Sequence, residues 1–215
     1  MITEDVGDTS RGYPVTDSNP WIRSGSPPVP GAPRPAPPTL GPVTVSSPQG
    51  GVPVPDQADR LPRRESAAQA TVWWLGVHGG AGESSLSLLA AGSRAADHAW
   101  PMPAARGLVN RVVLVARTNY TGLTAAQRAA REWASGSLEE QIRIEGLVLV
   151  PDQPGRMPKP LRLLSQLVGG GVPRIWSLPW VDAWRFGPVD PSAEPAKGFG
   201  VLFSDLSLHS TAPRT

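Results

Sequence analysis

An apolar run that ends in a glycine-rich turn constrains the fold of this chain more than any other feature. Residues 73–86 read WWLGVHGGAGESSL. This order predicts a strand, a tight loop and then a helix. In such a loop the backbone N–H groups and the start of the helix can surround a phosphate. Glu83 stands directly after the last glycine, where a phosphate-binding loop carries a lysine. The stretch therefore predicts the shape of a phosphate cradle without its positive charge.

The rest of the chain alternates between apolar runs and helix-like segments. Strands are predicted at 71–77, 111–117, 144–150 and 174–178, and helices at 84–96, 124–134 and 160–168. The first strand is apolar without alternation, which suits a strand covered on both faces of a parallel sheet. Alternation of strands and helices predicts βαβ units with right-handed crossovers. The expected fold class is α/β, a reduced three-layer sandwich with a mostly parallel sheet.

The loops that follow the four predicted strands are the expected location of a ligand site. They comprise residues 78–83, 117–122, 151–156 and 179–187. In parallel sheets the carboxyl ends of the strands meet at one edge, and ligands bind in the crevice outside that edge. The loops should therefore lie together.

Proline content divides the chain into parts. Fourteen of the 26 prolines lie in residues 1–65, where Tyr13 and Trp21 are the only aromatic residues. Such a segment buries too little apolar area to offset its ordering entropy. We expect a disordered tail at 1–65, an α/β domain at 66–190 and a C-terminal extension at 191–215. The extension would hold one edge strand at 200–203 and then be disordered. Prolines at 27–30 and 33–38 suit either a linker or a ligand for an aromatic groove.

Charge and composition narrow the classes of function. A net charge of +2 does not indicate nucleic-acid binding, and the one modest basic cluster, Arg156, Lys159 and Arg162, suits either an anion contact or a solvated face. The chain has no cysteine and three scattered histidines, so no metal site is expected. Its start lacks an apolar segment typical of a signal peptide or membrane span, so a cytoplasmic protein is expected.

Residues 78–84, HGGAGES, resemble the deviant Walker A motif KGGxGK[ST] of the MinD/ParA family of P-loop ATPases. Three later segments are similar to that family in the same order. Residues 112–126 resemble a later strand and its helix, 147–156 the strand beside the adenine, and 174–180 a strand ending in a proline near the base. The resemblance covers about residues 71–190. The chain also resembles uncharacterised actinobacterial proteins, often associated with mobile elements, that share the HGGAG loop.

Departures from the family pattern argue against catalysis. His78 and Glu83 replace both family lysines, and the short stretch between Ala96 and Arg111 lacks the family's switch aspartate and Walker B motif. A carboxylate about 4 Å from a phosphate is repelled by about 1 kcal/mol per charge pair in water, and by several times more in a cleft. Asp152 ends an apolar strand as a Walker B aspartate would, but its position matches the base-side loop. No catalytic residue and no metal ligand are expected.

The resemblance implies a degenerate nucleotide site. Its expected members are His78, Gly79, Gly80, Ala81, Gly82, Glu83, Ser84, Ser85, Asp152 and Pro179. His78 suits either a hydrogen bond to a phosphate or a polar turn. Trp176, Trp180 and Trp184 suit either a stacking surface or packing against the core. No cofactor is expected, because Glu83 disfavours ATP with magnesium.

Three hypotheses of function remain. The first is a pseudo-ATPase that serves as a binding or scaffolding module for a protein partner, in plasmid or mobile-element biology. The second is an unusual nucleotide-binding protein or ATPase whose missing lysine is supplied by a partner. The third is a loop retained for folding alone, in which glycines permit the turn and Glu83 complements the helix dipole. The resemblance also implies a homodimer across the loop face.

Overall fold

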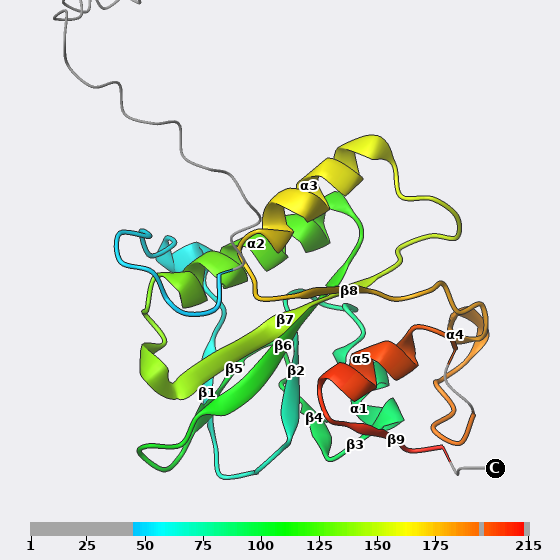
Figure 1. Cartoon of the computed structure of the whole chain (residues 1–215), viewed down its shortest axis with the longest axis horizontal. Helices are drawn as coiled ribbons and strands as arrows, with labels where there is room; N and C mark the ends of the chain where they lie inside the picture. Colours follow the sequence, from blue (N-terminus) through cyan, green and yellow to red (C-terminus); the bar gives the residue numbers. More distant parts are fainter. Residues whose placement is uncertain (1–44, 194–195, 213–215) are drawn as a thin grey trace, which may run out of the picture. The chain divides into compact units, whose positions relative to one another are not determined.

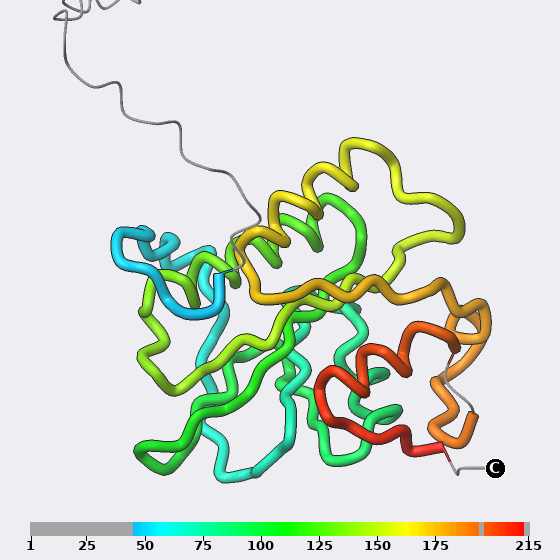
Figure 2. Tube along the Cα trace, in the orientation of Figure 1, coloured from blue at the N-terminus to red at the C-terminus, as the bar shows by residue number. Residues whose placement is uncertain are grey.

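The computed structural model describes residues 45–193 and 196–212, all within one compact unit, Leu40–Thr215. The disorder expected for residues 1–44 and the proline-rich segments at 27–30 and 33–38 lie outside the described residues. Within this unit, helices and strands alternate along the chain and build a layered α/β fold (Figures 1 and 2).

A five-stranded parallel sheet forms the centre of the fold. Its order is β4 (Ser93–Ala95), β2 (Val72–Gly76), β6 (Asn110–Arg117), β7 (Ile142–Val150) and β8 (Ile175–Ser177). Each neighbouring pair is parallel. The four predicted strands are confirmed as β2, β6, β7 and β8, and the predicted α/β class is confirmed with them.

Helices cover both faces of this sheet (Figure 1). Helices α2 (Tyr120–Ala134) and α3 (Lys159–Gly169) pack on one face, and α1 (Glu83–Leu89) and α5 (Phe199–Asp205) on the other. Because side chains alternate along a strand, Trp73 and Leu75 of β2 join the core under α2, while Val72 and Trp74 join the core under α1. This explains the unbroken apolar run of β2, since both of its faces are covered.

An irregularity in β7 accommodates a charged residue. The register with β6 shifts between Val112 and Val113, whose partners are Ile144 and Gly146, so Glu145 is the extra residue of a β-bulge. Its carboxylate accepts hydrogen bonds from Arg111 (2.8 Å) and lies 2.9 Å from Nε of Arg143. Burial raises the pKa of Glu145, but these two guanidinium groups outweigh it, and the pKa lies below its usual value.

Two predicted elements differ in the structure. The helix predicted at 84–96 ends at Leu89, and β3 (Ala90–Ala91) and β4 follow. The small residues of this segment drive no helical packing, and Gly92 has φ +78°. The strand predicted at 200–203 is wrong, because α5 occupies it. Its buried residues, Phe199, Leu202 and Phe203, and the buried Leu206 that follows it recur at helical spacing.

The packed part of the chain begins well before the predicted boundary at residue 66. Val45, Val52 and Leu61 pack against the core under α2. The 3-10 helix η1 (Gln57–Asp59) and strand β1 (Arg63–Ser66) lie in this segment, and β1 pairs in parallel with β5 (Trp100–Pro103). Single apolar residues between the prolines anchor this segment to the core. They are too few to stand out in the average composition of residues 1–65, which predicted disorder.

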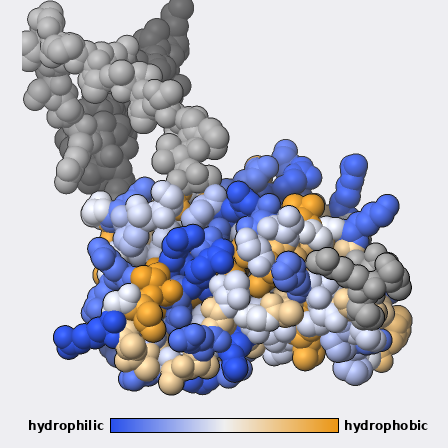
Figure 3. Space-filling model, turned by 60° about the horizontal axis from the view of Figure 1, so that its bottom comes forward, coloured by the Kyte–Doolittle hydropathy of each residue, from blue (hydrophilic) through white to orange (hydrophobic). Residues whose placement is uncertain are grey.

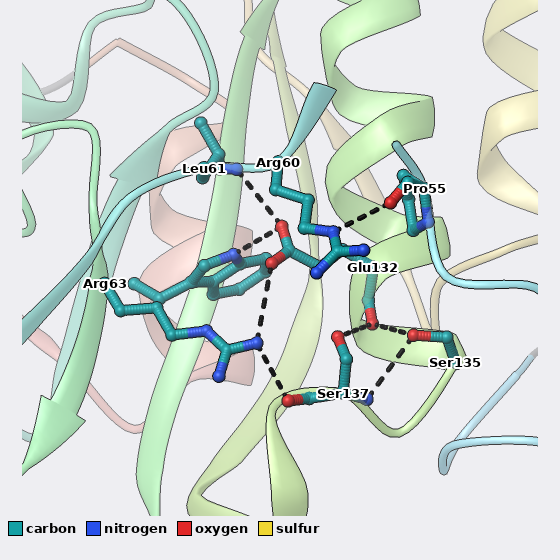
Figure 4. A network of polar contacts seen from close by, with 8 residues as sticks. Pro55, Arg60, Leu61, Arg63, Glu132, Ser135 and Ser137 are labelled. Atoms are coloured by element: carbon teal, nitrogen blue, oxygen red, sulfur yellow. Dashed lines mark hydrogen bonds and ion pairs between the residues drawn. The ribbon is translucent and has the colours of Figure 1, made fainter. Parts of the chain in front are cut away.

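A buried glutamate on α2 holds this segment in place (Figure 4). Glu132 is 1 % exposed. Its Oε2 accepts hydrogen bonds from the backbone N–H of Leu61 (3.2 Å) and from the indole N–H of Trp100 (2.9 Å). Its Oε1 has no hydrogen-bond partner among the described residues, and the nearest cation, NH2 of Arg63, lies 3.9 Å away. One oxygen therefore serves two donors, while the other has only the long ion pair with Arg63.

The C-terminal part continues with short elements. After the 3-10 helix η2 (Glu139–Gln141), β7, α3 and β8, the chain forms α4 (Ala183–Phe186), α5 and β9 (His209–Ser210). Strand β9 pairs antiparallel with β3. On the face drawn in Figure 3, apolar residues form separate patches between polar ones. Such patches are normal on the surface of a single chain and do not by themselves identify a partner surface.

Candidate functional site

The carboxyl edge of the sheet gathers the predicted loops. Strands β2, β6, β7 and β8 run parallel, so the loops that follow them lie at one edge, as predicted. From β2 the chain continues to β4 on one side, and from β6 it continues to β7 and β8 on the other. The order therefore reverses between β2 and β6, and such switch points form the crevices where α/β sheets bind ligands. The glycine loop lies at this point.

The glycine loop is a tight turn that two of its glycines require. Gly80 has φ +73° and Gly82 has φ +108°, a region that other residues rarely adopt. The N–H of Ala81 donates to the carbonyl of His78 (3.3 Å), and the N–H of Leu86 donates to Gly82 (3.0 Å). A Cβ on Gly79 would meet nothing within 4 Å. The backbone conformation therefore requires glycine at positions 80 and 82, whereas neither a positive φ nor a close contact requires it at position 79.

Glu83 points back into the protein. The residue is 4 % exposed, and its Oε2 accepts a hydrogen bond from the N–H of Gly76 (2.7 Å), at the end of β2. Its Oε1 lies 3.2 Å from Nδ1 of His98. The residue at the position of the family lysine therefore joins the last residue of β2 to the start of α1. It acts as a support inside the loop.

His98 completes this support from a strained backbone. Asp97 and His98 have φ +52° and +56°, which is uncommon for residues with a side chain. Nδ1 of His98 lies 2.8 Å from the carbonyl of Gly76, which can only accept, so Nδ1 carries the proton. A Cβ on Gly76 would lie 2.9 Å from that nitrogen. Because Gly76 has no side chain, His98 and Glu83 can both come close to the end of β2.

His78 links the ends of two strands. Its Nε2 lies 3.0 Å from the backbone nitrogen of Arg117, at the end of β6. A backbone N–H can only donate, so Nε2 accepts and Nδ1 carries the proton, which it donates to the carbonyl of Gly79 (2.8 Å). A Cβ on Gly122 would lie 2.8 Å from Nε2 of His78 and 2.5 Å from the carbonyl oxygen of Arg117. His78 is a polar turn residue here, with both ring nitrogens occupied.

Arg117 is the central side chain that the sequence analysis did not include in the site. Its Nε donates to the carbonyl of Gly80 (3.1 Å), and NH1 donates to the carbonyl of Pro151 (2.7 Å). The guanidinium thereby joins the glycine loop to the end of β7. A charged residue that ends an apolar strand is the signal that could have identified it, because that position lies at the carboxyl edge.

The other predicted site residues lie at different points of this edge. Asp152 follows β7, where its carboxylate accepts from Nδ2 of Asn119 (3.0 Å) and its backbone N–H donates to Oγ1 of Thr118 (3.0 Å). Ser84 is exposed, and Ser85 is half-buried in the first turn of α1. Pro179 follows β8. The structure thus places Asp152 against the loop after β6 rather than against the glycine loop.

Two hollows open at this edge. One, of about 390 Å³, lies between the loop after β7, the start of α3 and the end of β8, and Thr118, Asp152 and Ser177 are among its lining residues. The other, of about 150 Å³, lies at the ends of β6 and β7 and is lined by Arg117 and Pro179 together with Trp180 and Trp184. These hollows are the spaces in which a ligand of this edge could lie.

The three tryptophans of this region divide into two roles. Trp176 belongs to the core under α5, where its indole N–H donates to Asp205 (2.9 Å). This hydrogen bond, with Arg174 at 2.8 Å, holds the pKa of Asp205 below its usual value. Trp180 and Trp184 are half-buried and line the smaller hollow. Packing accounts for Trp176, whereas Trp184 both packs against the core under α5 and lines the smaller hollow with Trp180.

In residues 45–193 and 196–212, no group of three or more acidic, histidine or cysteine side chains is arranged to hold a metal ion. In the same ranges, no helix has the length and apolarity needed to cross a membrane.

Comparison with known proteins places the chain in a family. A family model described as "Family of unknown function (DUF6668)" matches residues 70–199, more than half of the chain. No curated protein and no solved structure matches the chain. The match spans the glycine loop, all the predicted site residues and most of the carboxyl edge.

Proposed function

The chain belongs to the DUF6668 family, and we propose that it is a catalytically degenerate protein of P-loop type, similar to MinD and ParA. In this proposal it acts as a binding or scaffolding module for a protein partner. The parallel α/β sheet is compatible with a P-loop fold. Plasmid or mobile-element biology and a cytoplasmic setting form part of the proposal, and they rest on the sequence resemblance alone.

One observation carries the proposal: the carboxylate of Glu83 is buried and bonded to the N–H of Gly76. A phosphate-binding loop uses a lysine at this position to reach the terminal phosphates of a nucleotide. Here the position supplies a negative charge, and that charge is part of the loop's own hydrogen bonding. Phosphate binding would place like charges together in a cleft, at a cost of several kcal/mol by Coulomb's law at an effective dielectric of about 20.

The surroundings of the loop support the same proposal. Helix α1 has seven residues, and no side chain caps its start. A short helix contributes little dipole to hold an anion. His78, at the position of the other family lysine, has both ring nitrogens in hydrogen bonds within the protein. Each of the two charge-bearing positions of the family is therefore used for structure.

Calorimetric titration of the full chain with ATP and ADP, with and without magnesium, tests the proposal. The full chain is used because residues 45–66 pack on the core. We expect no binding. Glu83→Lys should also fail to bind and should lose about 2 kcal/mol of unfolding free energy, since the N–H of Gly76 loses its buried acceptor. Glu140→Lys, an exposed substitution with the same charge change, is the control.

Micromolar binding of ATP by the wild-type chain would overturn the proposal and favour the alternative, an unusual nucleotide-binding protein completed by a partner. Binding by Glu83→Lys alone would show that the turn is an open cradle whose charge is reversed. That outcome would contradict the supporting role assigned to Glu83.

A further inference from the structure

The smaller hollow at the carboxyl edge combines positive charge with aromatic walls. Arg117 enters it from the end of β6 and Arg185 from α4. Trp184 also lies on α4, and Trp180 lies between β8 and α4. Two parts of the chain, the end of β6 and the segment after β8 that includes α4, thus bring two guanidinium groups and two indole rings to a space of about 150 Å³.

Neither arginine is neutralised. Among residues 45–193 and 196–212, no ion pair joins Arg117 or Arg185 to a carboxylate. Arg117 bonds to two carbonyls, those of Gly80 and Pro151, which leave three of its five N–H groups for another partner. Asp182, which is near in sequence, accepts from the indole of Trp180 (2.7 Å). Two cations that share a hollow repel each other, and an anion between them would remove that cost.

The aromatic walls are held in place and set the size of the ligand. Trp184 packs edge-on against Phe199 of α5, with ring centroids 5.6 Å apart. An apolar cavity of about 150 Å³ is large enough for benzene. Pockets for drug-sized ligands are larger, about 300–1,000 Å³, so this space suits a ligand with a single ring.

We propose that the hollow formed by Arg117, Arg185, Trp180 and Trp184 binds a small anion with a single aromatic ring, an aryl carboxylate. The planar carboxylate matches the planar guanidinium fork, and the ring lies against the indoles. The site goes beyond the proposed function, which concerns the glycine loop and a protein partner.

Titration of the ¹⁵N-labelled full chain with benzoate tests this site. The readout is the indole N–H signals, with that of Trp180 identified by its loss in Trp180→Phe. We expect a saturable shift of this signal with a dissociation constant in the millimolar range. Arg185→Gln should weaken binding about tenfold, the value of one charge-assisted hydrogen bond. Arg162→Gln, which removes an exposed charge on α3, should leave it unchanged. Arg185 suits the test better than Arg117, whose guanidinium also bonds the glycine loop.

Three further results would overturn the proposal. The first is the absence of a saturable shift with benzoate. The second is equal binding of benzamide, which has the ring without the charge. The third is equal binding of inorganic phosphate, which has a charge without the ring. ATP with magnesium, added in a separate titration, tests the glycine loop through the backbone signals of residues 78–84. Binding of ATP there would overturn the proposed function. The aryl carboxylate site would still be tested separately by the benzoate titration.

Discussion

Two buried glutamates at opposite edges of the sheet show how differently the same side chain can be used. Glu83 lies at the carboxyl edge, where one oxygen accepts from Gly76 and the other contacts His98. Glu132 lies at the end of α2, at the amino edge, where Oε2 serves two donors and Oε1 has none among the described residues. The first carboxylate joins the two ends of the glycine loop and contacts His98. The second holds a distant segment and Trp100.

An unusual residue in a motif is therefore not always the buried residue on which the fold depends most. Glu83 is unusual in the sequence because it replaces a lysine of the Walker A motif. Glu132 lies in an unremarkable helix, yet it connects residues that are 71 and 32 positions away. A buried charge needs partners, and because one oxygen of Glu132 accepts no hydrogen bond, we expect this site to be the more sensitive one.

The largest expected effect is at Glu132. Replacing it by alanine leaves the N–H of Leu61 and the indole of Trp100 without an acceptor, so we expect Glu132→Ala to lose about 3 kcal/mol of unfolding free energy. Urea denaturation followed by circular dichroism measures this loss. Hydrogen exchange at the amide of Leu61 should become faster. Glu132→Gln keeps an acceptor oxygen and should lose less than half as much. A loss below about 1 kcal/mol in the alanine variant would contradict this prediction, because Glu132 would then contribute little more to the free energy of unfolding than a surface residue.

A smaller effect is expected at the Glu83 support. In Gly76→Ala the new Cβ would lie 2.9 Å from Nδ1 of His98 and 3.0 Å from Cδ of Glu83. The imidazole must move, so we expect a loss of about 1–2 kcal/mol and a changed Nδ1 signal of His98 in nitrogen NMR. Gly79→Ala, which meets nothing within 4 Å, is the matched control and should stay within about 0.5 kcal/mol of wild type. Equal effects of the two substitutions would show that crowding at Gly76 does not matter.

The smallest effect concerns Glu145, a carboxylate that has strong partners and is only partly exposed. Its pKa in the folded protein lies below the ordinary value of 4.5. Its contribution to stability is therefore fully present above about pH 4.5 and is lost as the pH falls through the folded pKa. We expect Glu145→Gln to be less stable by about 1 kcal/mol at about pH 7, and the difference should shrink on acidification. Urea denaturation at several pH values measures it, and a difference that grows in acid would contradict the sign.

The parts of the fold that could be predicted are those with a dense local signal. Uninterrupted apolar runs identified β2, β6, β7 and β8, and their alternation with helices predicted the parallel sheet. Strand β4 was missed, because Ser93, Arg94 and Ala95 carry no strand pattern and pair only because they follow α1 beside β2. The packed segment before β1 was missed because its few apolar residues lie between prolines. Such elements depend on tertiary contacts.

The position of the candidate site could be predicted from the sequence, but the contacts among its side chains could not. The glycine turn and the edge of the sheet followed from the sequence, because glycine conformation and strand direction are local properties. The orientation of Glu83 toward Gly76 is a side-chain property that the sequence pattern does not contain, and the approach of His98 to Gly76 is a contact across 22 positions. Arg117 required the relative position of three loops. Interactions of this kind arise only when separate parts of the chain meet.

The helix that follows the glycine loop depends on the far end of the chain. Thr211 donates its backbone N–H to the carbonyl of Leu89 (3.0 Å) and its hydroxyl to that of Leu88 (2.8 Å). Strand β9 pairs with β3 just beyond α1. During synthesis the loop and α1 are made more than a hundred positions before these partners. The last carbonyls of α1 can therefore obtain these hydrogen bonds only after residue 211 has been synthesised.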